Sequence, residues 1–171
     1  MNDWGASVYG DPCRECGFTW AVSISDALSQ ISNIPSVYRA LLADRSGREH
    51  HPGLGWSVSE YVSHVADNLR IWAERLMGVV EGGPPLVGHY DENELAHARH
   101  YREIPLAAAL WSLTRSVDDW LTSVEASADS GVVLVHPERG ELTRSDVVLA
   151  NAHDALHHQR DIERTLRDLR P

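Results

Sequence analysis

The sequence predicts an all-α protein, a four-helix bundle preceded by a short irregular N-terminal arm. Four long segments of the 171-residue chain carry apolar residues at the spacing of an amphipathic helix. The pattern contains no convincing sheet, since only one short apolar run is a candidate hairpin. Helices that each present one apolar face pack around a shared core, so these observations favour a bundle.

One domain preceded by a short arm is expected. Residues 1–18 contain Gly, Pro and both cysteines and form the irregular arm, whereas residues 19–171 form the bundle. Thr19 is a candidate cap for a first helix that runs toward residue 44. Pro35 falls inside this helix and is expected to kink or split it, because proline lacks a backbone N–H.

The second helix is expected after a glycine-rich loop at residues 45–55. Ser57 or Ser59 is its candidate cap, and a Gly-Gly-Pro-Pro run ends it. The polar stretch that follows, residues 86–104, contains at most one short helix. The apolar stripe of the second helix has a helical period: Val58, Val62, Val65, Leu69, Trp72, Leu76 and Val79.

Pro105 suits the first residue of the third helix. Residues 132–142 form either a small hairpin or an extended loop. Thr143 or Ser145 caps the fourth helix, which reaches almost to the C-terminus. Three tryptophans on these helices are interpreted as core residues: Trp72, Trp111 and Trp120.

Charge and composition exclude several classes of partner. The formal net charge is -10, whereas nucleic acids and acidic membrane surfaces require a basic surface, so neither is an expected partner. The first residues lack the basic and apolar regions of a signal peptide, and no apolar run is long enough to span a bilayer. We therefore expect a cytoplasmic protein.

Three histidines are the candidate metal ligands. His153 and His157 lie four residues apart, on one face of the predicted fourth helix. His64 lies beside the apolar stripe of the predicted second helix. Three protein ligands and one open position are typical of a catalytic metal site. The alternative is that all three are solvated surface histidines.

Two segments resemble motifs of DinB-like proteins. Residues 56–67, Trp-Ser-Val-Ser-Glu-Tyr-Val-Ser-His-Val-Ala-Asp, resemble the second-helix motif, in which a Trp-Ser or Trp-Thr start precedes a metal-binding histidine. Residues 153–162 resemble the last-helix motif, in which an HxxxH or ExxxH pair is followed by a second histidine and Asp-Ile or Asp-Leu. The resemblance implies a four-helix bundle of DinB/YfiT-like type, with a divalent metal held by His64, His153 and His157.

The resemblance also implies a range of functions. The superfamily includes YfiT-like hydrolases, bacillithiol transferases and mycothiol-dependent maleylpyruvate isomerases. A similar protein would be a divalent-metal-dependent thiol S-transferase or hydrolase that acts on a small electrophile, and it could form a homodimer. The alternatives are a non-enzymatic metal-binding stress-response protein and a structural or interaction bundle.

The cofactors are less specified. Imidazole ligands suit Zn²⁺ or Ni²⁺, and also Fe²⁺. All 15 basic residues are arginine, which indicates a GC-rich genome; an actinobacterial source would make mycothiol the thiol co-substrate. Arg70 and Arg160, with Arg164, are candidates for holding carboxylates of the thiol or the substrate. No catalytic residue is assigned.

Three polar residues next to the histidine pair have two interpretations. Asp154, His158 and Asp161 could orient the ligand imidazoles. Alternatively, Asp154 and His158 are a surface pair one helical turn apart.

The cysteines also leave alternatives open. Cys13 and Cys16 form a CxxC pair, and no second cysteine pair exists to complete an all-thiolate zinc site. They could form a structural metal clip with His50 or His51, from the loop before the second helix. They could instead be a redox pair or a disulfide, or have no special role.

Overall fold

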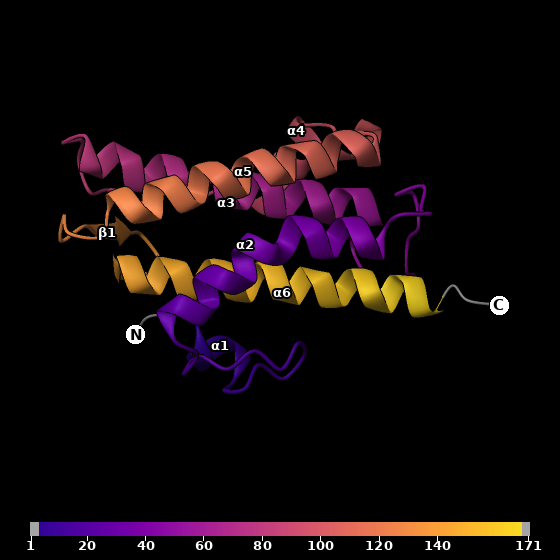
Figure 1. Ribbon diagram of the computed structural model, residues 1–171, viewed down its shortest axis with the longest axis horizontal. Helices are drawn as coiled ribbons and strands as arrows, with labels where there is room; N and C mark the ends of the chain where they lie inside the picture. The colour runs from indigo at the N-terminus through magenta and orange to yellow at the C-terminus, as the bar shows by residue number, and fades with distance from the viewer. Residues whose placement is uncertain (1–3, 169–171) are drawn as a thin grey trace.

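Four long helices build the structure, a computed structural model that describes residues 4–168. Figure 1 shows them packed lengthwise as a bundle, which confirms the predicted fold. None of the helices in the described range is both long and apolar enough to cross a membrane. The bundle helices are α2 (Ile24–Leu41), α3 (Val58–Val80), α5 (Leu106–Ala126) and α6 (Arg144–Asp168).

The bundle has two layers. Helices α3 and α5 form the upper layer of Figure 1, and α2 and α6 form the lower one. Helix α2 packs on α5 and α6, and α3 packs on the same two helices. The colour gradient shows that α2 and α6 run in one direction and α3 and α5 in the other. Helices α3 and α6 are therefore antiparallel neighbours, although about 60 residues separate them along the chain.

Shorter elements complete the fold. Helix α1 lies in the N-terminal arm, below α6 in Figure 1, and α4 and the 3₁₀ turn η1 connect α3 to α5. Strands β1 and β2 form an antiparallel hairpin, in which Val133 lies opposite Thr143 and His136 opposite Gly140. The bounds are α1 (Ala6–Tyr9), α4 (Glu92–Ala98), η1 (Tyr101–Glu103), β1 (Val133–His136) and β2 (Gly140–Thr143).

Hydroxyl side chains define two helix starts. Ser57 and Glu60 form a reciprocal capping box at α3, and the Ser57 backbone N–H donates to Glu60 Oε2 at 2.9 Å. Thr143, rather than Ser145, precedes α6. Its Oγ1 accepts the Asp146 backbone N–H at 3.2 Å. Both caps satisfy backbone donors that the first helical turn leaves without partners.

Helix α2 differs from the expectation in two respects. It begins after Ser23, whose side chain accepts the Asp26 backbone N–H at 3.0 Å, and not at Thr19. It also continues through Pro35 as one helix, so the expected split is wrong, while the alternative, a kink at Pro35, stays a prediction. Pro35 is buried in the packed interior of the bundle, and this packing offsets the backbone hydrogen bond that the proline cannot donate.

The apolar faces of the four long helices meet in one core. Trp72 and Trp120 are buried there, and Trp120 Nε1 donates to Asn151 Oδ1 at 2.8 Å. Trp111 is 65% exposed, so its assignment to the core is wrong. It follows Leu110 by one residue, and this rotation of about 100° takes it off the apolar stripe of α5.

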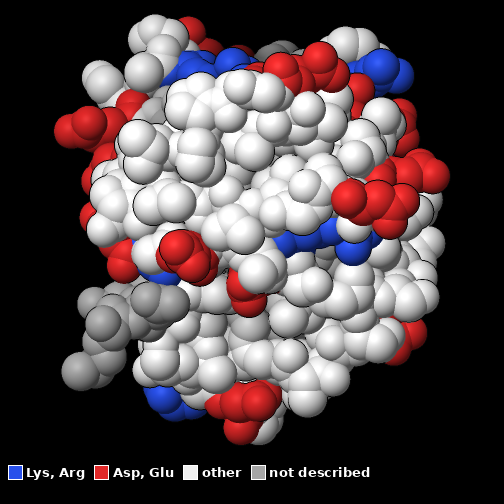
Figure 2. Space-filling view, turned by 90° about the vertical axis from the view of Figure 1, so that its left-hand side faces the viewer, with Lys and Arg blue, Asp and Glu red and all other residues white. Residues whose placement is uncertain are grey.

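Figure 2 shows the side of the molecule that lies at the left of Figure 1. Acidic side chains are scattered around this face, and the basic ones form small separate groups beside them. Other residue types form most of the described surface on this face. This distribution agrees with the net charge of -10.

Candidate metal centre and pocket

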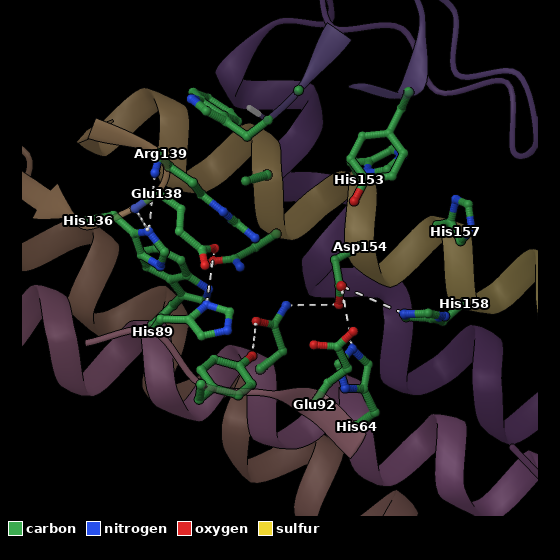
Figure 3. Close-up of a pocket in the computed structure, with 18 of the residues that line it drawn as sticks. His64, His89, Glu92, His136, Glu138, Arg139, His153, Asp154, His157 and His158 are labelled. Carbon is green, nitrogen blue, oxygen red and sulfur yellow. Dashed lines mark hydrogen bonds and ion pairs between the residues drawn. The ribbon is translucent and has the colours of Figure 1, made fainter. Parts of the chain in front are cut away.

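A cavity of about 420 Å³ opens between α3, α6, the hairpin and the N-terminal arm. Figure 3 shows its polar side chains, which converge from elements far apart in the sequence. His64 comes from α3, Asp154 from α6, His136 from β1, and Tyr9 from the arm. Tyr90 comes from the segment between α3 and α4. The packing of α6 against α3 therefore creates the site.

The first cluster of candidate ligands in this cavity consists of His64, Asp154 and His158. Each offers one ligand atom, and these atoms all lie within 4.8 Å of one another. Asp154 Oδ1 lies 3.5 Å from His64 Nε2 and 3.7 Å from His158 Nε2. Asp154 and His158 are one helical turn apart on α6, so they share a face. That face is directed toward α3 (Figure 3).

A neighbouring carboxylate orients His158. Asp161 Oδ2 lies 2.9 Å from His158 Nδ1. An ionised carboxylate only accepts hydrogen bonds, so Nδ1 carries the proton. The other ring nitrogen, Nε2, faces His64 and Asp154. Metal-binding histidines in proteins are commonly oriented in this way.

Asp154 is also held from its other oxygen. Asn68 Nδ2 donates to Asp154 Oδ2 at 2.8 Å, and the Tyr90 hydroxyl donates to Asn68 Oδ1 at 3.0 Å. Burial opposes ionisation of Asp154, but His64, His158 and Asn68 outweigh it and hold the pKa well below its usual range. The Asp154 carboxyl group is therefore ionised at neutral pH. Burial lowers the pKa of His64, but the negative charge of Asp154 opposes burial, and this pKa is raised above its ordinary value.

The second cluster lies on the adjacent face of α6. Cys13, Cys16, His153 and His157 each offer one ligand atom within 4.8 Å of the others. His153 and His157 are directed toward the arm, whereas Asp154 and His158 are directed toward the centre of the pocket (Figure 3). The cysteines therefore lie beside His153 and His157. The alternative partners, His50 and His51 in the loop before α3, belong to neither cluster.

The structure thus divides the three predicted ligands between two clusters. His64 lies with Asp154 and His158, while His153 and His157 lie with the cysteines. A single site of all three histidines stays a prediction. The sequence did carry a signal for the first cluster, because the related motif admits an acidic residue before the histidine and Asp154 and His158 have the same four-residue spacing.

The predicted arginines lie elsewhere. Arg70 pairs with Asp67 at 3.4 Å and with Glu74 at 2.6 Å, and its side chain is 38% exposed. Arg160 is half-exposed and lies 3.7 Å from Glu163. Neither contributes to the wall of the pocket among the described residues, and neither does Arg164. Their role in holding a thiol or substrate stays a prediction.

Two other arginines line one side of the pocket together with Glu138, so this side carries a net positive charge. The Arg75 guanidinium lies 4.5 Å from the centre of the Trp72 ring, and Arg139 lies 5.9 Å from it. Arg75 Nη2 donates to the Gly88 carbonyl, while its Nη1 is buried without a hydrogen-bond partner in the described structure. Burial and the charge of Arg139 lower the pKa of Arg75. Arginine side chains nevertheless stay protonated in proteins, so Arg75 keeps its positive charge. This side of the pocket is therefore suited to an anionic group.

A buried histidine stands beside these arginines. His136 Nδ1 accepts the backbone N–H groups of Glu138 at 3.2 Å and Arg139 at 3.3 Å. Burial and the charges of Arg139 and Arg75 lower the pKa of His136 to about 4. His136 is therefore neutral at physiological pH. It lies outside the helical motifs of the sequence, so no pattern singles it out.

An antiparallel bundle with histidines and a carboxylate clustered on a cavity between two helices defines a class of helical proteins equipped for metal binding. The comparisons with known proteins agree with this class. The family model described as the DinB superfamily matches residues 34–162, and the chain belongs to this superfamily. The predicted resemblance is therefore confirmed. No curated protein matches the sequence.

One solved structure shares the fold over nearly the whole chain. It is described as YfiT from Bacillus subtilis, a probable metal-dependent hydrolase with an unusual four-helix bundle topology. The TM-score is 0.75, the sequence identity is 16%, and the match covers 88% of this chain and 91% of YfiT. At this identity the likeness establishes the fold.

Proposed function

We propose that the protein is a divalent-metal-dependent enzyme that adds water or a low-molecular-weight thiol to a small electrophile bearing an anionic group. One observation carries this proposal: the ligand atoms of His64, Asp154 and His158 lie within 4.8 Å of one another on the wall of a 420 Å³ cavity. The description of YfiT as a probable metal-dependent hydrolase supports the metal requirement.

The donor set fits such a metal. Two imidazoles and one carboxylate are a common set for catalytic Zn²⁺ and also suit Ni²⁺ or Fe²⁺. The 3.5 and 3.7 Å separations of Asp154 from His64 and His158 are close to the roughly 3–3.5 Å between ligand atoms bound to one metal at about 2.0–2.2 Å. A bound divalent metal would lower the pKa of a water or thiol at its open position.

The residues around the cluster support this chemistry. Asp161 fixes the ring of His158, and the hydrogen-bonded pair of Asn68 and Tyr90 fixes Asp154. The Trp56 ring lies 4.9 Å from His64 between ring centres, which limits access of water from that side. The ligands are therefore held ready for the metal, and little reorganisation is needed.

The cationic side of the pocket determines the proposed substrate class. Arg75 has an unpartnered buried Nη1, and a buried donor without an acceptor costs free energy. Arg75 and Arg139 also line the cavity, so a carboxylate or another anionic group on the electrophile or on the thiol would meet two positive charges there. Figure 3 shows Arg139 on the opposite side of the pocket from His158, so such a ligand would extend from the arginines to the metal.

Thiol transfer is the finer part of the proposal. The resemblance to thiol-transferase members of the superfamily supports it, and mycothiol is the candidate thiol. Two assays test the proposal. Turnover of monochlorobimane with each common bacterial thiol measures thiol transfer, and cleavage of an activated ester without thiol measures hydrolysis. Metal-free protein and protein reloaded with Zn²⁺ or Ni²⁺ are compared, together with His158→Ala. The control is His97→Ala on α4, because His97 lies outside the pocket wall.

Each outcome has a defined meaning. Thiol-dependent turnover that requires metal and is lost in His158→Ala supports a transferase. Metal-dependent ester cleavage without thiol supports a hydrolase. Metal binding with no turnover of either kind would favour the non-enzymatic alternative. If protein that carries Cys13→Ser and Cys16→Ser, and so lacks the second cluster, binds no divalent metal, the proposed function is wrong.

A further inference from the structure

The N-terminal arm forms a compact turn around its two cysteines. The Gly17 backbone N–H donates to the Cys13 carbonyl at 2.9 Å, and the Cys13 N–H donates to the Phe18 carbonyl at 2.7 Å. Gly17 has a φ of +77°, a left-handed conformation that glycine adopts without strain. This turn places both thiols on the same side of the arm, within 4.8 Å of ligand atoms on α6.

The first histidine on α6 has an unused nitrogen. His153 is only 5% exposed, and its Nε2 is buried with no hydrogen-bond partner among the described residues. Aromatic rings of the arm surround it: the ring centres of Tyr9 and Trp20 lie 4.5 and 4.8 Å from its own. A buried polar atom without a partner is costly, so this nitrogen requires a ligand.

The second histidine is oriented like a metal ligand. His157 Nδ1 faces Cys13 Sγ at 3.9 Å. Its other nitrogen, Nε2, lies 3.3 Å from a carboxylate oxygen of Glu15. A carboxylate on one ring nitrogen holds the other nitrogen available for a metal. Glu15 lies between the two cysteines, so the CxxC turn itself supplies this carboxylate.

We propose that Cys13, Cys16, His153 and His157 bind a zinc ion that fastens the N-terminal arm to α6. Two thiolates and two imidazoles are a standard closed set for structural zinc, with no open position. Zinc bonds of about 2.3 Å to sulfur and 2.0–2.1 Å to nitrogen place tetrahedral ligand atoms roughly 3.3–3.8 Å apart. The present separations, at most 4.8 Å, require a contraction of at most about 1.0–1.5 Å.

The close approach of the two cysteines also favours a cation at this position. Two adjacent thiolates repel each other, and a divalent cation between them allows both to ionise.

This zinc site would support the pocket without taking part in its chemistry. Trp4 and Tyr9 of the arm, and Trp20 just after it, line the cavity that contains His64 and Asp154. Fastening the arm therefore holds one wall of the pocket in place. The inference is independent of the proposed function, because the two clusters share no ligand.

The test uses the reduced, metal-free full-length protein and Co²⁺ as a spectroscopic probe. Tetrahedral cobalt bound to thiolates gives a charge-transfer band that cobalt bound only to nitrogen and oxygen does not give. We expect wild type to show this band at saturation, Cys16→Ser to weaken it, and the double variant Cys13→Ser, Cys16→Ser to lose it. His158→Ala, which alters the other cluster, and His50→Ala, which removes the alternative loop histidine, should both keep the band.

A second measurement does not depend on a variant. One equivalent of Zn²⁺ should protect both thiols of wild type from a thiol-reactive dye, and a chelator should restore their reactivity. The proposal is overturned if cobalt-saturated wild type lacks the thiolate band, or if the thiols react equally fast with and without Zn²⁺. It is also overturned if His50→Ala loses the band while His153→Ala and His157→Ala keep it.

Discussion

Replacing Asp161 by Asn tests how the pocket prepares its metal ligands. The Asp161 carboxylate accepts a charge-assisted hydrogen bond from His158 Nδ1 at 2.9 Å, and its side chain is only 15% exposed. Asn keeps the size and can still accept the bond, but it lacks the charge. A charged partner contributes about 1.5–3 kcal/mol and a neutral one about 0.5–1.5. The difference of roughly 1–1.5 kcal/mol predicts about tenfold weaker metal binding.

The assay measures the affinity of the bundle site alone. Metal-free protein carrying Cys13→Ser and Cys16→Ser is titrated with Zn²⁺ or Ni²⁺ against a coloured chelator, with and without Asp161→Asn. Asp119→Asn is the matched control, because Asp119 is exposed on α5 and lies outside the pocket. If Asp161→Asn binds metal within about twofold of its parent, or if Asp119→Asn weakens binding equally, the orientation of His158 by Asp161 does not contribute to affinity.

Three further predictions concern the pocket and the core. Arg75→Gln should raise the KM for an anionic substrate about 10- to 100-fold, because a buried charged donor is lost. Arg70→Gln is the control and should leave KM unchanged. Equal changes of KM in the two variants would contradict the proposed substrate class. His136 takes up a proton near pH 6.5 in the unfolded chain but only near pH 4 in the folded protein. Its contribution to the free energy of unfolding is therefore complete above pH 6.5 and decreases as the pH falls toward 4. Urea unfolding should show this loss, at most about 3 kcal/mol, reduced in His136→Asn; an identical pH profile in the variant would refute it. Leu113→Ala, at a fully buried position, should cost about 2–5 kcal/mol, whereas Leu86→Ala, 72% exposed, should change stability by less than about 0.5.

The fold could be predicted because its signals are local. The apolar stripes of α3 and α5, and the hydroxyl cap at Ser57, act within one helix and need no knowledge of its neighbours. Pro35 failed as a helix breaker because its burial in the bundle core depends on the other helices. Trp111 failed because residue type alone does not reveal which side of α5 faces the core.

The site was harder to predict because it depends on the rotation of one helix. The pairs at positions 153 and 157 and at 154 and 158 have the same spacing, and they differ by about 100° around α6. The packing of Ala152, Ala155 and Ile162 in the core sets this rotation, and it directs Asp154 and His158 toward α3. The pairing of the arm with α6 joins residues about 140 positions apart, and no local pattern encodes it.

The most direct test of the central claim is a crystal structure of protein loaded with Zn²⁺ or Ni²⁺, in which anomalous scattering locates each ion. We predict an ion about 2.0–2.2 Å from an imidazole nitrogen of His64, a carboxylate oxygen of Asp154 and an imidazole nitrogen of His158. An ion held instead by His64 together with His153 and His157, or a pocket without any ion at full metal loading, would contradict the account.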